Sequence, residues 1–174
     1  AIGPKHNVFI TDQGNFRVQV FSQSGTFLSE FGTKGRGNGM FLKPTHVAAD
    51  SKGNVYVTDW ERRDIQKFVP EIVPPGPGTP YKWSLTFGGK ETKDYEQGRF
   101  YKKADAYGPN GIAVNSKDQI HVSDSGNCRV QVFDSDGKFT HQIPSAPYTP
   151  DLDLTGVRAQ KAYLEKAFAR NYNQ

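Results

Sequence analysis

Three stretches of the chain align with one another without gaps: AIGPKHNVFITDQGNFRVQVF at residues 1–21, AADSKGNVYVTDWERRDIQKF at residues 48–68 and AVNSKDQIHVSDSGNCRVQVF at residues 113–133. In each, a β-rich run ends in Thr-Asp or Ser-Asp, and a second run then ends in V-Q-V-F or I-Q-K-F. A supersecondary unit repeated in this way decides the architecture of a chain. The repeat therefore takes precedence over any single predicted element.

Each copy predicts four short strands, a to d, joined by tight turns. In the second copy these are His46–Asp50, Val55–Thr58, Ile65–Val69 and Ser84–Phe87, and their β-branched and aromatic content is typical of strands. Four antiparallel strands repeating every 40 to 50 residues or so are typical of a β-propeller blade. The predicted fold class is all-β: part of a β-propeller of four-stranded antiparallel blades, with the first blade truncated and a short C-terminal helix.

Composition agrees with a turn-rich β protein. The 174 residues include 18 Gly and 11 Pro, and mean hydropathy is −0.68. No apolar run approaches the roughly 20 residues of a membrane-spanning helix. A single cysteine, Cys128, excludes an intrachain disulfide and any site with several cysteines. The net charge of +4 permits contact with anionic partners without predicting it. The compartment stays open, with an extracellular or periplasmic location favoured over the cytoplasm.

The second copy carries the fullest version of the motif. Residues 41–59 read F-x-x-P-x-x-V-A-x-D-x-x-G-N-V-Y-V-T-D, and the other copies add N-x-R-V-Q-V-F. This pattern resembles the NHL repeat over residues 1–144. The WD40 alternative lacks support, because no Gly-His opening and no Trp-Asp strand end is present. The resemblance implies a ring of six blades.

Three blades do not close a propeller, which has four to eight. Ala1 aligns with Ala48 and Ala113 inside strand a, so the alignment begins within a blade. We therefore expect additional blades, from the same polypeptide or from another chain, to be partners of this segment. A longer polypeptide is the favoured of the two explanations.

The residues that recur at the b–c turn are predicted to have a structural role. Residues that stabilise each blade recur in every copy of the repeat, whereas a catalytic set on this fold is asymmetric and does not recur. We expect side-chain hydrogen bonds to brace each turn. The second copy has Arg62 and Asp64 where the others have Asn and Arg, so its turn needs another brace. The candidate structural set is Asp12, Asp59, Asp124, Asn15, Arg17, Asn127 and Arg129.

His46 is the one weak metal candidate. It opens strand a of the second copy, where the resembling peptidylamidoglycolate lyases bind zinc with histidines from several blades. The third copy has Gly111 at that position, and one ligand cannot make the usual three or four. No cofactor and no catalytic residue is therefore predicted. A lyase or hydrolase of the amidoglycolate or streptogramin lyase kind remains the alternative function.

The favoured function is a non-catalytic scaffold that binds protein or another macromolecule through loops on one face. Its candidate binding surface is a mixed basic and aromatic insertion. Some NHL-like propellers bind single-stranded RNA, but interleaved acidic residues make nucleic acid the weaker alternative here. The candidate surface residues are Tyr95, Arg99, Phe100, Tyr101, Lys102 and Lys103.

Two further segments interrupt or follow the repeat. The c–d connection of the second copy, Pro70–Lys82, has five prolines and predicts an extended, polyproline-like insertion. Residues 145–154 are predicted to be a linker, and residues 155–174 an amphipathic helix. That helix is expected to pack on the propeller, with docking of a partner chain or of a membrane surface as the alternatives.

Overall fold

The computed structural model of this chain describes residues 1–72, 78–89, 97–100 and 108–143. Within these ranges the chain forms β-strands and two short 3-10 turns. In order, they are β1 (Val8–Asp12), η1 (Gln13–Asn15), β2 (Arg17–Phe21), β3 (Phe27–Phe31), β4 (Thr33–Lys34), β5 (Met40–Phe41), β6 (Pro44–Ala49), β7 (Val55–Asp59), β8 (Asp64–Pro70), β9 (Tyr81–Gly88), β10 (Ile112–Val114), β11 (Ile120–Asp124), η2 (Ser125–Asn127), β12 (Arg129–Phe133) and β13 (Phe139–Ile143).

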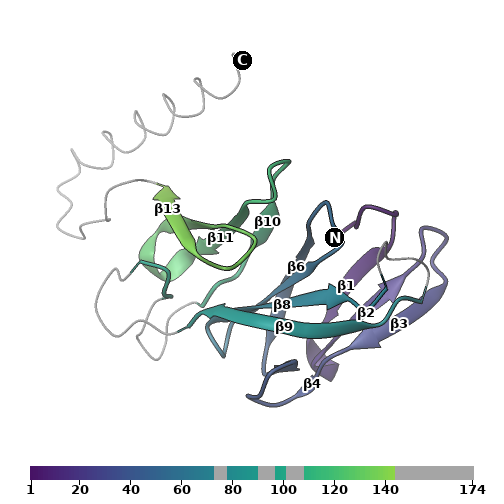
Figure 1. Cartoon of the computed structure of the whole chain (residues 1–174). Helices are drawn as coiled ribbons and strands as arrows, with labels where there is room; N and C mark the ends of the chain where they lie inside the picture. The colour runs from purple at the N-terminus through teal and green to yellow at the C-terminus, as the bar shows by residue number, and fades with distance from the viewer. Residues whose placement is uncertain (73–77, 90–96, 101–107, 144–174) are drawn as a thin grey trace, which may run out of the picture.

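Eleven of the strands form three antiparallel sheets in sequence order, and β4 and β5 form a separate parallel pair. The three sheets are β1-β2-β3, β6-β7-β8-β9 and β10-β11-β12-β13, which we call the first, second and third blades. The two four-stranded blades confirm the predicted fold class. Figure 1 shows the three blades side by side, with the second between the other two.

The first blade has three strands and a short stub in place of the fourth. Ile2 forms an isolated bridge with Val8, and the N–H of Phe9 donates to the carbonyl of Ala1 at 2.8 Å. The stub pairs with β1 on the side where β6 and β10 pair with their own second strands. The position of the first copy's strand a is therefore occupied at residues 1–2.

The alternation of side chains along each strand builds two cores. One lies between the first and second blades and includes Val18, Val20, Val55, Val57 and Phe68, each at most 2% exposed. The other lies between the second and third blades and includes Tyr56, Ile65, Ile120, Val122 and Phe133. All five residues of β7 are buried because the second blade packs on both faces.

The insertion after β8 departs from the predicted polyproline form at both its ends. β8 runs to Pro70 and β9 begins at Tyr81, so these residues extend the hairpin. The N–H of Glu71 donates to the carbonyl of Pro80 at 2.9 Å, which continues the ladder one step further. Strand pairing thus overrides the preference of the prolines for the polyproline conformation. These prolines lie at positions of the strand edge where no backbone N–H is needed as a donor.

The linker and C-terminal helix expected at residues 145–174 lie outside the described residues. In the described part of the chain, no helix has the length and apolar character needed to cross a membrane.

Candidate functional site

The aspartate at the end of strand b has different surroundings in each blade. In the first blade, Asp12 accepts hydrogen bonds from the side chains of Asn15 at 2.9 Å and Arg17 at 2.9 Å. These two bonds, that of Asn15 first, hold the pKa of Asp12 below its ordinary value. Arg17 also pairs with Glu30 at 2.6 Å. The partly exposed carboxylate therefore braces its turn in the charged form.

The third blade buries the same pair. Asp124 accepts from Asn127 at 2.9 Å, Arg129 at 2.7 Å and Gln131 at 3.0 Å, all through one carboxylate oxygen. The side chains of Asp124 and Arg129 are 0% and 2% exposed. The second oxygen, Oδ1, has no partner among the described residues. A buried ion pair of this kind needs such multiple hydrogen bonds to offset its desolvation.

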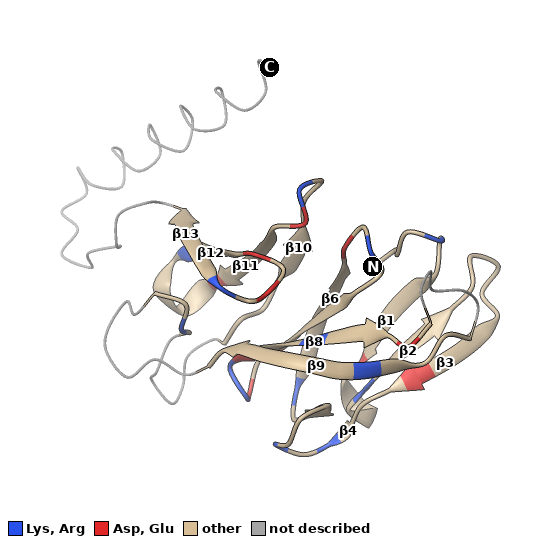
Figure 2. Ribbon diagram, in the orientation of Figure 1, with Lys and Arg blue, Asp and Glu red and all other residues tan. Residues whose placement is uncertain are grey.

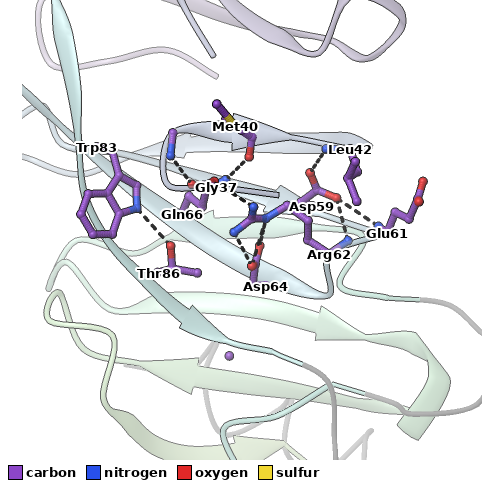
Figure 3. Close-up of polar contacts among 12 residues, drawn as sticks. Gly37, Met40, Leu42, Asp59, Glu61, Arg62, Asp64, Gln66, Trp83 and Thr86 are labelled. Carbon is purple, nitrogen blue, oxygen red and sulfur yellow. Dashed lines mark hydrogen bonds and ion pairs between the residues drawn. The ribbon is translucent and has the colours of Figure 1, made fainter. Parts of the chain in front are cut away.

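Asp59 in the second blade binds backbone instead of side chains (Figure 3). Its carboxylate accepts from the N–H groups of Leu42 at 2.7 Å and Lys43 at 3.1 Å, in the segment that joins the first and second blades. It also accepts from the N–H groups of Glu61 and Arg62 in its own turn. One carboxylate thus fastens an interblade link to a turn.

Arg62 and Asp64 supply the second blade's other brace. Arg62 Nε lies 3.1 Å from both Asp64 oxygens, and its Nη1 donates to the carbonyl of Gly37 at 2.9 Å (Figure 3). Burial raises the pKa of Asp64, and the adjacent Arg62 guanidinium partly opposes that rise. The residues that break the repeated Asn-x-Arg pattern therefore pair with each other.

A glutamine on strand c clamps the incoming link in two blades. Gln66 accepts from the N–H of Gly39 at 2.8 Å and donates to the carbonyl of Met40 at 2.7 Å. Gln131 accepts from the N–H of Gly98 at 2.8 Å and donates to the carbonyl of Arg99 at 2.6 Å. Each side-chain amide forms hydrogen bonds with one N–H and one carbonyl of the interblade link, as the backbone of a neighbouring strand would.

The residue that follows each clamped segment of the link is a buried phenylalanine. Phe41 and Phe100 are both 0% exposed, and they lie 5.6 Å and 6.3 Å from the rings of Phe68 and Phe133. This corrects the expectation that Phe100 belongs to a binding surface. The surrounding Gly-x-Phe repeat makes it a core residue. The flanking Arg99 is exposed, and its place in a binding surface stays a prediction.

These carboxylates are occupied in holding the fold. A general base needs a lone pair within reach of substrate. Both oxygens of Asp59 accept backbone N–H groups, and Asp124 is fully buried.

The glutamine clamp was not predicted from the sequence, although the signal was present. The glutamine occurs in all three copies of the V-Q-V-F or I-Q-K-F run.

The b–c turns and the two links lie on one side of the blades, which we call the turn face: residues 13–16, 32–43, 60–63, 89–100 and 125–128 where described. On this face two lysine ammonium groups lie over aromatic rings. Lys34 Nζ lies 5.0 Å from the ring centroid of Phe16, and Lys43 Nζ lies 4.2 Å from that of Trp60. In Figure 2, blue segments follow β4 and the turn below β8. The cations that are exposed or half-buried here, beyond the bracing arginines, are Lys34, Arg36, Lys43, Arg63 and Arg99.

His46 lies exposed on β6, and its N–H donates to Thr58 Oγ1 at 3.1 Å. Gly111 makes the equivalent bond to Ser123 Oγ at 2.6 Å, so the two positions correspond in space. In the described part of the chain, no three His, Cys, Asp or Glu side chains gather as a metal site would require. The expected surface residues Tyr95, Tyr101, Lys102 and Lys103 lie outside the described residues.

Comparison with known proteins identifies a matching family model and several similar proteins. The family model of the NHL repeat matches residues 107–133. Protein brain tumor of Drosophila melanogaster is 26% identical over 148 residues, which are 82% of this chain and 12% of that protein. A probable peptidyl-alpha-hydroxyglycine alpha-amidating lyase of Caenorhabditis elegans is 26% identical over 145 residues, or 81% of this chain and 36% of that protein.

Among solved structures, virginiamycin B lyase from Staphylococcus aureus superposes with a TM-score of 0.52 at 15% sequence identity. The match covers 87% of this chain and 41% of that chain. It therefore bears on the fold alone. The chain spans less than half the length of each of these three proteins.

Proposed function

This chain is an NHL-repeat protein with the blades of a β-propeller, and from that premise we propose that it is a non-catalytic scaffold that binds an acidic protein partner on its turn face. One observation carries the proposal. Five cations on turns and links gather on a face whose backbone is pinned by buried hydrogen bonds. Rigid loops that carry an excess of positive charge favour recognition of an acidic surface.

The turn face suits protein better than single-stranded RNA. Base stacking needs open aromatic rings. The rings of Phe16 and Trp60 are instead covered by Lys34 and Lys43. The acidic side chain of Glu61 is exposed among the cations and would repel phosphates. A protein partner can match such a mixed pattern with side chains of both signs.

Lyase activity is the rival function, because two of the relatives are named as lyases. The proposal favours binding over catalysis because the third blade has Gly111 where the second has His46. In this proposal neither a metal nor another cofactor takes part. His46 then serves only as an exposed strand residue.

The test uses charge reversal on the turn face. A fluorescent acidic decapeptide rich in Glu and Tyr should bind the chain, and anisotropy should show binding weakening as salt rises. The double variant Lys34→Glu with Arg36→Glu should bind at least fivefold more weakly. The matched control is Lys52→Glu with Lys117→Glu, which reverses two cations in the a–b turns and should leave the affinity unchanged.

Three outcomes would contradict the proposal. They are equal loss in the control variant, tighter binding of an oligouridylate than of the acidic peptide, and turnover of a peptidyl α-hydroxyglycine substrate. If turnover is seen, the His46→Ala variant separates a metal-dependent lyase from a contaminant, because only the lyase would lose activity.

A further inference from the structure

The chain contains two Asn-Gly pairs, Asn38-Gly39 and Asn110-Gly111. Asparagine deamidates most readily when glycine follows it, because glycine has no side chain to hinder attack by its own backbone nitrogen. Both asparagines are exposed to solvent. Each pair is therefore a candidate site of spontaneous covalent modification.

Deamidation begins at the backbone nitrogen of the glycine. That nitrogen attacks Cγ of the asparagine, a new N–Cγ bond closes a succinimide ring, and the C–N bond of the side-chain amide breaks. Ammonia leaves and takes with it the proton of the glycine N–H. Water then opens the ring at either carbonyl and gives aspartate or isoaspartate, so that one water is consumed for each ammonia released. A glycine N–H held in a hydrogen bond must lose that bond before its nitrogen can react.

The glycine nitrogen of the first pair is held by the glutamine clamp of the second blade. The N–H of Gly39 donates to Gln66 Oε1 at 2.8 Å, and the Gln66 side chain is fully buried. On the other side of Asn38, Arg62 Nη1 donates to the carbonyl of Gly37 at 2.9 Å (Figure 3). Both peptide units that flank Asn38 are thus fixed, and attack on its Cγ requires that the clamp open first.

The second pair is held by a different acceptor. The N–H of Gly111 donates to Ser123 Oγ at 2.6 Å, and the N–H of Ser123 donates to the carbonyl of Gly111 at 2.9 Å. These bonds continue the β10–β11 ladder, whereas Gly39 lies in a link that is largely exposed. A backbone hydrogen bond in an exposed link opens more often than one in a sheet. The first pair is therefore the one more open to reaction.

We propose that Asn38 is a site of deamidation controlled by the Gln66 clamp, and that its conversion adds a negative charge to the turn face. While the clamp is closed, the asparagine persists. Each opening frees the Gly39 nitrogen, so the rate of conversion follows the fraction of time that the clamp is open. The product carboxylate lies in the same link as Lys34 and Arg36. Isoaspartate also adds a methylene group to the backbone of that link.

Peptide mapping by mass spectrometry measures the reaction during incubation at mildly alkaline pH, since conversion raises the mass of the fragment by about 1 Da. The reference is a synthetic peptide of residues 37–43, GNGMFLK, which has no clamp. Asn38 should deamidate at least about tenfold more slowly in the folded 174-residue chain than in this peptide. Within the folded chain, Asn38 should be converted before Asn110. This comparison needs no variant.

Gln66→Leu removes the acceptor of the Gly39 N–H, keeps the apolar volume and should speed the conversion of Asn38 about tenfold. The matched variant is Ser123→Ala, which removes the acceptor of the other pair. It should speed the conversion of Asn110 and leave that of Asn38 unchanged. The Asn110 rate in Gln66→Leu reports general loosening of the fold, because unfolding would accelerate both sites.

The effect on binding rests on the proposed function, whereas the deamidation does not. Asn38→Asp should weaken binding of the acidic decapeptide about twofold. Gln23→Glu adds the same charge in the exposed β2–β3 turn and should leave the affinity unchanged. If the unmodified chain does not bind the decapeptide, the proposed function fails and the deamidation rates still decide the role of the clamp.

Three rate measurements would overturn the proposal. They are conversion of Asn38 in the folded chain as fast as in the peptide, conversion of Asn110 before Asn38, and an Asn38 rate in Gln66→Leu equal to that of the unmodified chain. Equal acceleration of both sites in Gln66→Leu would also overturn it, because the clamp would then act only through global stability.

Discussion

At the scale of single residues, one aspartate position performs two kinds of work. Asp12 holds side chains of its own turn, whereas Asp59 holds the backbone of an interblade link. Asp59→Ala leaves four N–H groups without the acceptor of their partly buried hydrogen bonds and should cost about 3 kcal/mol or more of unfolding free energy. Urea denaturation followed by circular dichroism measures the loss.

The control for that prediction is Asp12→Ala. Its partners reach solvent, so its loss should be much smaller than that of Asp59→Ala. Equal losses in the two variants would show that the link contacts of Asp59 contribute nothing beyond the turn. An unchanged denaturant slope is needed for the comparison, because it shows that both variants unfold from the same compact state.

The sequence predicts this position and not its partners. Gapless alignment identified Asp12, Asp59 and Asp124, since identical spacing requires an equivalent backbone. The N–H donors of Leu42 and Lys43 are invisible in a motif, because any residue supplies a backbone N–H. Phe100 was misplaced for a related reason. Its local surroundings are basic and polar, and only the comparison with Phe41 reveals a core position.

At the scale of elements, the end of strand d needs a glycine where the incoming phenylalanine packs. Gly32 and Gly88 have φ of 98° and 83°, and a Cβ on either would collide with the ring of Phe41 or Phe100. Gly32→Ala and Gly88→Ala should each cost about 2–4 kcal/mol, from left-handed strain and overpacking together. Thermal unfolding of purified variants measures the cost.

Gly25→Ala is the matched control for these variants. Gly25 has the same φ of 83° as Gly88, but nothing lies within 4 Å of its added Cβ. It should lose only the strain component, about 1–2 kcal/mol. A loss in Gly25→Ala as large as that in Gly88→Ala would assign the whole effect to the backbone.

The a–b turns of neighbouring blades are joined by a pH-dependent contact. The Ser51 N–H and hydroxyl donate to Asp118 at 2.9 Å and 2.7 Å, and they hold its pKa below 3.8. A lowered folded pKa stabilises the fold above the unfolded pKa, and this contribution is lost as pH falls through the folded pKa. The contact lies at the surface, so its contribution is below about 1 kcal/mol.

Asp118→Asn should therefore be slightly less stable than the unmodified chain at pH 7, with the difference shrinking as pH falls below about 3.8. Urea titrations at several pH values between 7 and 3 measure that difference. Ser51→Ala removes the hydroxyl and keeps the backbone N–H, so it should reduce the pH dependence attributed to Asp118 without abolishing it. A constant difference at every pH would indicate a steric rather than an electrostatic cause.

At the scale of the whole molecule, the two cores are separated by the sheet of the second blade. Val57 belongs to one core and Val122 to the other, and both are 0% exposed. In an array whose units contact only their neighbours, damage stays local. Val57→Ala should cost about 2 kcal/mol and speed hydrogen exchange in β1–β3, while β11–β13 keep their protection. Val122→Ala should do the reverse.

Amide exchange measured residue by residue decides between this local response and a single cooperative unit. Uniform acceleration across all three blades in either variant would count against locality. The fold class itself was accessible from sequence because strand pairing follows chain order. The uneven burial of equivalent positions, such as Ile10 and Val57, was visible only once the blades were placed beside one another.

The order of the strands also determines when each glutamine clamp can form as the chain leaves the ribosome. Gly39 is translated 27 residues before the glutamine that clamps it, and Gly98 is translated 33 residues before its own. At about 5–20 residues per second, each link waits roughly 1–7 s for its clamp. During that interval Phe41 or Phe100 lacks its cover, so a translational pause inside the following blade lengthens the period in which a chaperone or another nascent chain can bind it.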